Sequence, residues 1–482
     1  MFTNSGCIHQ FAAGITVCFV NFFYGIAGSW TSPFQSLLLS NGSPVGPLTH
    51  SQISWIGSVP ALGAITGALF WPIVIDMVGR KNTILINIVP YFVCNLILYM
   101  SPSYIFLIIA RFLSGIGIVG SMVNNSSYIA EISEDKYKGI LVSILIVTIN
   151  AGSLTIVIGG SLISYALVNL ITTIGCALVF ILLMFIPESP VHLLRMGDED
   201  GAKEMLKWLR STEDETVLKR ELNKLKASFL DASQSTHKLT IREVVDSPYY
   251  LKVLIIGLFL QSGITLSGIT VMMGYTNDVV ERTVSDTTAG KYAFFLILTQ
   301  NVGSCLMILT SHMFNRKVVH ISCQTVCSAC MLLIGALQVT HSLWSVQVPW
   351  QLLLFFLCCY YFTQGFGVSI MVYMVIPEIF SVECRNSFTS ILMFEHFAFQ
   401  FITTKLYPVL VDRVHFSGWA FAFGTYSAFI AIFWKIFVPE SKGRNIQQIF
   451  SKLCKTNVIP EDQMKPYGGN KDKGTTDPTT TL

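Results

Sequence analysis

The amino-acid sequence predicts an all-helical membrane protein in which twelve transmembrane helices form two six-helix bundles of related sequence. Hydrophobic residues make up 52% of the 482 residues and charged residues only 12%, whereas a soluble domain carries about 25% charged residues. Long apolar runs recur along the chain. A short charged signature occurs at residues 76–81 and again, in altered form, at 312–317. This spacing indicates two copies of one membrane unit.

Twelve apolar runs account for the predicted helices. Each run is nearly free of charge over the roughly 20 residues that a helix needs to cross the hydrocarbon core. Continuous apolar runs favour helices over the alternating pattern of a membrane β-barrel. The runs of the first half lie near 11–35, 53–75, 83–101, 104–124, 139–163 and 165–186. The runs of the second half lie near 251–276, 290–311, 318–340, 348–376, 387–410 and 417–438.

The distribution of Lys and Arg predicts the orientation of the chain. One side of the predicted topology collects 25 of the 31 basic residues, and the basic side of a membrane protein is cytosolic. We therefore attribute the net charge of +3 to topology and not to a nucleic-acid partner. No charged residue precedes Asp76, so the first run lacks the positive flank of a signal peptide and is expected to stay as a helix.

The predicted organisation follows from these runs and from their orientation. Both termini are expected in the cytosol, as is the charged segment between the two halves. The predicted parts are an N-terminus at 1–10, a six-helix bundle at 11–186, a central segment of loops and helices at 187–250, a second bundle at 251–438 and a tail at 439–482.

The parts outside the membrane carry three further signals. Residues 202–209 have the apolar spacing of an amphipathic helix, and the polar end of the tail is expected to be disordered. Asn41 opens the sequence Asn-Gly-Ser in a loop expected to be extracellular, so it is a predicted glycosylation site. The ending Thr480-Thr481-Leu482 weakly fits the C-terminus that PDZ domains capture by strand addition.

No enzyme, cofactor or metal centre is predicted. The spans hold no recognisable set of nucleophile, base and orienting residue, and no phosphate-binding loop or cofactor fingerprint is found. Cys323, Cys327 and Cys330 share one face of the ninth expected helix. We interpret them as small packing residues, because a zinc site would need deprotonated thiolates and a fourth ligand in the same dry place.

Several motifs, in this order and spacing, resemble the sugar porter branch of the major facilitator superfamily. They are Asp76-x-x-Gly79-Arg80-Lys81, Arg111 to Gly117, Tyr128 to Glu131, Pro187-Glu188-Ser189, Glu378 with Arg385, and Pro439-Glu440-Ser441. Finer matches are similar to the insect sugar transporters, including the facilitated trehalose transporters: Trp30 to Pro33, Ser54 to Ser58, and Phe401 to Lys405. The resemblance covers nearly the whole chain and implies alternating-access transport of a sugar across the plasma membrane.

The resemblance also implies a cytosolic latch, a set of ion pairs that joins the two bundles when the cavity faces outward. An alternative is that these charges only anchor helix ends to lipid headgroups, but anchoring alone would not require carboxylates. His312 and Asn315 stand where the family's second copy has an acid and a glycine, so the latch is expected to be weaker in that half or pH-sensitive through His312. The matching residues are Asp76, Arg80, Lys81, Glu131, Lys138, Arg316, Glu378 and Arg385.

A central sugar site is implied as well, but here the chain departs from the family. Ile146 and Ile264 stand where the family has glutamines, so much of the usual polar set is replaced. An alternative is that the remaining polar side chains only bond neighbouring helices. The candidate substrate-binding residues are Gln261, Thr265, Thr270, Gln300, Asn301, Tyr373, His396 and Phe397.

Three sites carry ionisable groups inside the spans, where a charge is costly unless it meets a cavity or partner. Arg111 matches a family arginine, and Lys405 is expected to snorkel to the outer surface. Glu395 with His396 could carry a coupled proton or form a buried hydrogen-bonded pair. Because the first expected helix has no acid, facilitated diffusion is preferred. A proton-coupled symporter and a sensor that binds sugar without transporting it remain alternatives.

Overall fold

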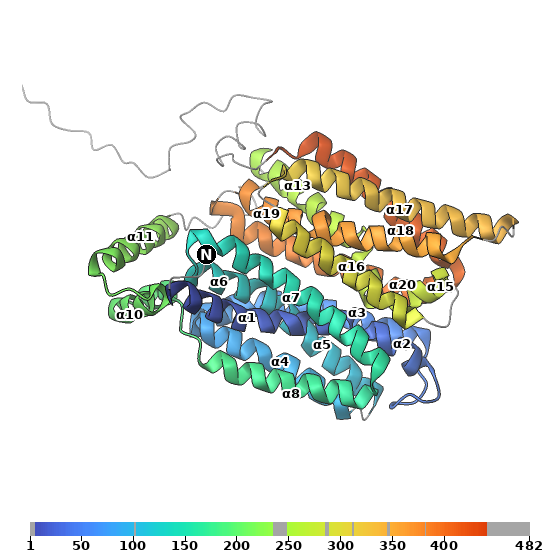
Figure 1. Ribbon diagram of the computed structural model, residues 1–482, viewed down its shortest axis with the longest axis horizontal. Coiled ribbons are helices and arrows are strands. Elements are labelled where there is room, and N and C mark those ends of the chain that lie inside the picture. Colours follow the sequence, from blue (N-terminus) through green and yellow to red (C-terminus); the bar gives the residue numbers. More distant parts are fainter. Residues whose placement is uncertain are drawn as a thin grey trace, which may run out of the picture.

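The computed structural model describes residues 5–100, 103–234, 248–284, 289–310, 313–344, 348–380 and 382–440. The helices run along the long axis of the molecule in two groups that lie side by side (Figure 1). The first group holds α1 (Ser5–Ser29), α2 (Thr31–Leu39), α3 (His50–Val78), α4 (Arg80–Met100), α5 (Tyr104–Gly120), η1 (Ser121–Asn125), α6 (Ser126–Ile132), α7 (Asp135–Leu162) and α8 (Tyr165–Met184).

The second group repeats this plan. It holds α13 (Pro248–Thr265), α14 (Ile269–Gly274), α15 (Thr276–Val284), α16 (Ala289–Thr310), α17 (Arg316–Trp344), α18 (Trp350–Thr363), η2 (Gln364–Val368), α19 (Ser369–Ile379) and α20 (Val382–Phe437). Between the groups, three short helices form a small polar unit: α9 (Pro190–Arg195), α10 (Glu199–Arg210) and α11 (Glu215–Gln234). The helix expected at 202–209 is confirmed by α10.

Eleven helical stretches of the described chain are long and apolar enough to cross a membrane. The last of them, at 387–437, has 51 residues. It contains a non-helical residue, His415, with φ of 58° and ψ of 164°, so α20 consists of two helices that meet there. With α20 counted as two, the structure has the predicted number of crossings, and the all-helical membrane fold is confirmed.

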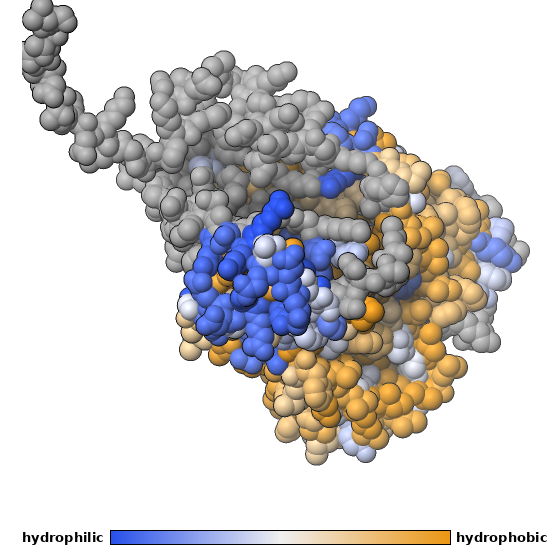
Figure 2. Space-filling view, turned by 60° about the vertical axis from the view of Figure 1, so that its left-hand side comes forward, coloured by the Kyte–Doolittle hydropathy of each residue, from blue (hydrophilic) through white to orange (hydrophobic). Residues whose placement is uncertain are grey.

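The surface has the two polarities of a membrane protein. Hydrophilic residues gather at the end of the molecule that carries α10 and α11, and hydrophobic residues cover the sides of the bundles beyond it (Figure 2). Large exposed side chains such as Leu69, Ile105 and Phe185 match a lipid environment, where apolar groups need no cover.

The doubled motifs have a structural role in each half. Gly79, with φ of 88°, ends α3 in a conformation that favours glycine. The Glu188 carboxylate then accepts the backbone N–H groups of Arg80 and Lys81, each at 3.0 Å. In the second half, Glu440 accepts the N–H groups of Arg316 and Lys317, each at 3.2 Å. A carboxylate is favourable at a helix N-terminus, so the glutamate of each Pro-Glu-Ser motif caps the helix that begins at the Arg-Lys pair.

Small residues allow the closest helix contacts. A Cβ atom built on Gly63 of α3 would overlap the Phe112 carbonyl of α5, and one built on Gly115 would overlap the Pro60 carbonyl. Backbone meets backbone at this crossing, as in other membrane helix pairs with small residues.

Two five-residue π-helical turns mark corresponding places in the two halves. They are η1, between α5 and α6, and η2, between α18 and α19. Such turns break the regular backbone ladder and are frequent at functional sites.

Candidate functional site

Polar side chains from both halves meet along the seam between the bundles. Across this seam α3 packs against α20, and α7 packs against α16 (Figure 1). Several predicted residues lie here, on α13, α14, α16, α19 and the first part of α20.

A break in the seventh crossing brings two predicted residues to the same place. The α13 helix ends at Thr265 and α14 begins at Ile269, with Gly268 at φ of 99° between them. The freed carbonyl of Ser267 accepts the Tyr360 hydroxyl at 3.0 Å. Irregular backbone inside a membrane is tolerated where it is buried in protein or lines a cavity, and such breaks mark the binding sites of many transporters.

The first part of α20, before His415, faces this break. His396 Nδ1 lies 2.7 Å from Thr265 Oγ1, and both residues are buried. Phe397 packs edge-on against the His396 ring. The hydroxyls of Thr270 and Thr403 are 3.5 Å apart. The structure thus brings these four predicted residues, Thr265, Thr270, His396 and Phe397, to one interface between α13, α14 and α20.

Two of the predicted residues, Gln261 and Gln300, are buried amides with unpartnered atoms among the described residues. Gln261 is fully buried, and neither amide atom makes a well-formed hydrogen bond with the described residues, although the Tyr373 hydroxyl lies within reach of the amide. Gln300 is 5% exposed, and its Oε1 has no partner in the described part of the chain. Because nearly all buried polar groups in proteins are hydrogen-bonded, these amides are suited to bind a polar ligand or water.

Asn301 lies at the same level but is already engaged. Its Nδ2 donates to the Asn150 carbonyl of α7 at 3.3 Å, and Asn150 Nδ2 donates to Ser304 Oγ at 2.9 Å. These bonds tie the two halves together through α7 and α16. In this conformation the Asn301 side chain therefore bonds neighbouring helices, which is the alternative to substrate binding.

Asn150 and Gln364 are two polar residues of the seam that the sequence reasoning missed. Gln364 opens η2, is fully buried and donates from Nε2 to Ser267 Oγ at 2.9 Å, while its Oε1 has no partner among the described residues. A search for every amide inside an apolar run would have found both.

The ionisable residues inside the spans have separate environments. His396 bonds to Thr265, whereas the buried Oε2 of Glu395 has no partner among the described residues. Arg111 is 2% exposed and donates to the carbonyls of Ala27 and Ile56 at 2.7 and 3.2 Å and to Thr31 Oγ1 at 3.4 Å. Its guanidinium also lies over the Trp30 ring. The arginine is thus satisfied by neutral acceptors of the first half.

The predicted latch residues lie at the end that carries α10 and α11. Arg80 pairs with Glu131 at 3.1 Å, and Asp76 with Arg195 at 3.7 Å. Lys81 Nζ donates to the Met184 carbonyl at 2.9 Å, and Lys138 is exposed. The Arg80, Lys81 and Glu440 contacts join residues of one half, and the Asp76 pair joins the first half to α9 of the central polar unit. The side chains of Glu378 and Arg385, and the whole of His312, lie outside the described residues, as does the tail with Thr480 to Leu482.

The opposite end, with α2 and α15, joins the two halves directly. Gln35 Nε2 donates to Asp278 Oδ1 at 3.3 Å, and the backbone N–H of Asn277 donates to Ser32 Oγ at 3.1 Å. At this end the structure is closed. The predicted glycosylation residue, Asn41, is exposed in the nearby loop between α2 and α3.

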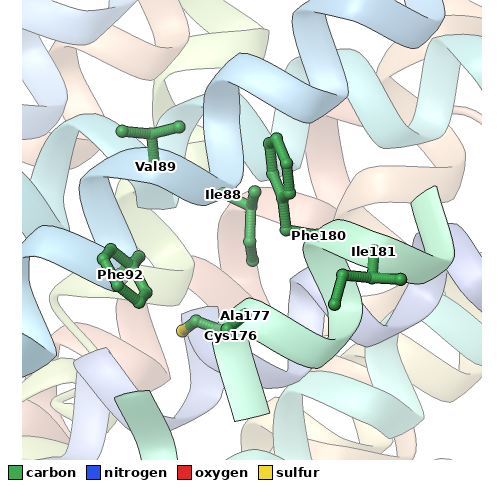
Figure 3. A pocket seen from close by; sticks show the side chains of 7 residues that line it. All are labelled: Ile88, Val89, Phe92, Cys176, Ala177, Phe180 and Ile181. Carbon is green, nitrogen blue, oxygen red and sulfur yellow. The ribbon is translucent and has the colours of Figure 1, made fainter. Parts of the chain in front are cut away.

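One well-formed hollow does not fit a sugar. It has a volume of about 320 Å³, lies between α4 and α8 and is lined by apolar side chains such as Ile88, Phe92 and Phe180 (Figure 3). No nitrogen or oxygen of these side chains could bond to a hydroxyl group, so we place the candidate site on the seam.

The three cysteines of α17 are buried. Cys327 Sγ lies 2.9 Å from Thr363 Oγ1, which fits the interpretation as packing residues. Within the described part of the chain, no group of three or more His, Cys, Asp or Glu residues is arranged to hold a metal ion.

Comparison with known proteins places the chain in a family. The model of the family "Sugar (and other) transporter" matches residues 5–452. A facilitated trehalose transporter Tret1-2 homolog of Drosophila sechellia is 24% identical, over 96% of this chain and 94% of its own length. The facilitated trehalose transporter Tret1 of Apis mellifera ligustica is also 24% identical, over 91% of this chain and 87% of its own length.

Solved structures agree on the fold. A partially occluded inward open conformation of the xylose transporter XylE from E. coli gives a TM-score of 0.76 at 19% identity, covering 91% of this chain and 100% of that one. The proton:xylose symporter XylE bound to 6-bromo-6-deoxy-D-glucose gives 0.75 at 20% identity, covering 93% and 99%. The chain is therefore a multi-pass membrane protein that belongs to the sugar transporter family of the major facilitator superfamily.

Proposed function

We propose that this chain is a facilitative transporter that moves a sugar, either a hexose or a trehalose-like disaccharide, across the plasma membrane by alternating access. The observation that carries the proposal is the broken seventh crossing, which Thr265, Thr270 and His396 line and where the buried amide of Gln261 makes no well-formed hydrogen bond with the described residues. Sugar hydroxyl groups both donate and accept hydrogen bonds. The amide and hydroxyl side chains at this break can therefore bind them. The names of the insect relatives support trehalose as a candidate.

The proposed substrate set is Gln261, Thr265, Thr270, Gln300, Asn301, Tyr373, His396 and Phe397. Each net hydrogen bond contributes only about 0.5–1.5 kcal/mol. A site built from such bonds holds a sugar near millimolar affinity, at about −4 kcal/mol, and releases it readily. That modest affinity suits a carrier.

Alternating access is supported by the asymmetry of the seam. The halves are tied at the end with α2 and α15. At the other end, the contacts described for the proposed latch lie within the first half or join it to α9 of the central unit. We take the latch to form across the halves when the cavity faces outward. In this assignment the end with α10 and α11, and both termini, lie in the cytosol.

Uniport is preferred to proton symport because of Arg111. A buried arginine could take part in proton coupling by pairing with a carboxylate that gains and loses a proton. Here its acceptors are two carbonyls and one hydroxyl, and no Asp or Glu precedes residue 76. Glu395 supports the alternative, since its buried oxygen has no partner among the described residues, and a carboxyl in that position could carry a proton together with His396.

The test is uptake of labelled trehalose, glucose and fructose by the full chain in liposomes, with and without an inward proton gradient. Facilitated transport predicts equilibration of one of these sugars to the same final level under both conditions. Accumulation above the outside concentration, abolished by Glu395→Gln, would overturn uniport in favour of symport. Saturable binding without flux would instead identify a sensor.

Topology and location are tested separately. Asn41→Gln should remove a glycan and increase mobility on a gel when the chain is expressed in insect cells, and surface biotinylation should label the wild-type chain. A change in mobility would place the loop between α2 and α3 outside the cell. The PDZ contact of Thr480 to Leu482 predicts binding that disappears when Leu482 is deleted.

A further inference from the structure

Lys405 contacts the opposite half of the molecule. Its ammonium nitrogen lies 3.8 Å from the centroid of the Trp55 ring on α3, whereas the sequence predicts that it snorkels outward. Ser54, the neighbour of Trp55, donates its hydroxyl to the Lys405 carbonyl at 2.6 Å. Phe401, one turn earlier on α20, packs against Trp55 with ring centroids 6.1 Å apart. Two consecutive residues of α3 thus hold one turn of α20.

These contacts lie toward the end at which the structure is closed. Trp55 stands near the start of α3, next to the loop that follows α2, and Lys405 lies in the last third of the helix that ends before His415. The same end carries the bonds of Gln35 with Asp278 and of Ser32 with Asn277. When the seam opens at this end, α3 and α20 must separate, and the contact between the Trp55 ring and the Lys405 ammonium group is broken.

A contact that exists in only one of two conformations shifts the balance between them. The attraction between a lysine and a tryptophan ring is electrostatic and grows as water is excluded. The flexible four-carbon stem of Lys405 can carry the ammonium into water once α3 moves away, since lysine side chains reach polar surroundings readily. The contact is therefore strong enough to bias the closed state and weak enough to open in each cycle.

We propose that Trp55 and Lys405 form an extracellular clasp, a cation–π contact between the halves that favours the inward-facing state. Both are positioning residues, because they set which end of the seam is open and do not need to touch the sugar. The clasp rests on the alternating access proposed above, but its test requires no sugar, so failure of the clasp and failure of sugar transport are distinguishable.

The test measures access to the seam from outside. Ser58 lies one turn after Ser54, on the same face of α3, and is fully buried. In a Ser58→Cys background, a membrane-impermeant maleimide is added to cells that express the full chain, and the labelling rate is compared with the same chain carrying Ser58. Lys405→Met and Trp55→Leu are expected to raise the rate by roughly 2- to 30-fold, which is the population shift that corresponds to a cation–π contact.

Three further variants keep the test decisive. Lys405→Arg preserves the cation and should label at the parental rate. The double variant Trp55→Leu with Lys405→Met should label no faster than Trp55→Leu, because Lys405→Met removes no further contact once the ring is gone. Lys435→Met makes the same substitution near the far end of α20 and should leave the labelling rate at the parental value. Parental labelling of Lys405→Met, fast labelling of Lys405→Arg, or additive single effects would each overturn the clasp. Surface expression of every variant excludes loss of folding as the cause of a change.

Discussion

At the scale of single residues, the proposed site combines satisfied and unsatisfied polar groups. Thr265 and His396 bond to each other, which fixes their positions before a ligand arrives. Gln261 remains without a hydrogen bond to the described residues. A buried polar group without a partner costs about 1–3 kcal/mol, so the fold is less stable with this amide than with an apolar side chain of similar size. Such a cost is expected where a residue serves a ligand.

Replacing Gln261 by leucine should therefore have two opposite effects. Apparent affinity for the transported sugar should fall by roughly 2- to 12-fold, the loss of one net hydrogen bond. The thermal midpoint of the purified, sugar-free protein should stay the same or rise, because no buried amide is left unpaired. The measurements are concentration-dependent uptake and thermal unfolding of the same preparation.

Gln324 provides the matched control. It is also a fully buried glutamine with no partner for either amide atom among the described residues, but it lies on α17, which packs against α18 and α20. Gln324→Leu should reproduce the effect on stability and leave sugar affinity unchanged. Equal loss of affinity in both variants would mean that Gln261 acts on the site only through the fold.

At the scale of elements, each doubled motif works as an interlocking pair within its own half. The glutamate that closes the sixth or the twelfth crossing caps the helix that starts at the Arg-Lys pair. The lysine side chain of each pair then donates back to a carbonyl near the end of that crossing, Met184 in the first half and Lys435 in the second. The signature thus stabilises helix ends whether or not it also forms a latch between halves.

The two caps should differ in strength. Glu188 accepts at 3.0 Å from two N–H groups and at 2.8 Å from that of Ser189, whereas the bonds to Glu440 are 3.2 Å long. Removing a helix cap costs about 0.5–2 kcal/mol. We expect Glu188→Ala to lie near the upper end of this range and Glu440→Ala near the lower end, as measured by thermal or denaturant unfolding. The reverse order would show that bond lengths at these caps do not govern their stability.

Glycine at the α3–α5 crossing has a different role from glycine on the surface. A Cβ on Gly115 would overlap the backbone of Pro60, while one on Gly139 of α7 would meet nothing within 4 Å. Gly115→Ala should lower stability by about 1–3 kcal/mol through overpacking, and Gly139→Ala should raise it by about 0.5–1 kcal/mol through helix propensity. Unfolding midpoints of the two variants check both signs. Tolerance of alanine at residue 115 would mean that the crossing can widen.

At the scale of the whole molecule, the sequence predicts the membrane crossings but not the contacts that depend on which conformation the protein adopts. The apolar runs predict the crossings because hydrocarbon thickness sets their length. The break at Gly268 is hidden, because the run at 251–276 stays apolar through it. The sequence places Lys405 near the outer end of its helix, but it does not show that Trp55, 350 residues earlier, comes within reach of the ammonium group. Partners across the seam depend on which end is closed, and a single sequence specifies both states.

The closed end can be locked to test whether transport requires it to open. The backbone nitrogen of Asn277 lies 3.1 Å from Ser32 Oγ, so the two Cα atoms are close enough for a disulfide, which needs them within about 7 Å. In the variant Ser32→Cys with Asn277→Cys, oxidation should join the halves and abolish sugar uptake, and a reductant should restore it. Each single cysteine variant should keep its uptake under oxidation, which controls for the native cysteines. A covalent bond between α2 and α15 holds that end shut in every cross-linked molecule. Undiminished uptake by the cross-linked protein would therefore mean that the sugar does not enter between the two halves. Alternating access would then be wrong for this chain.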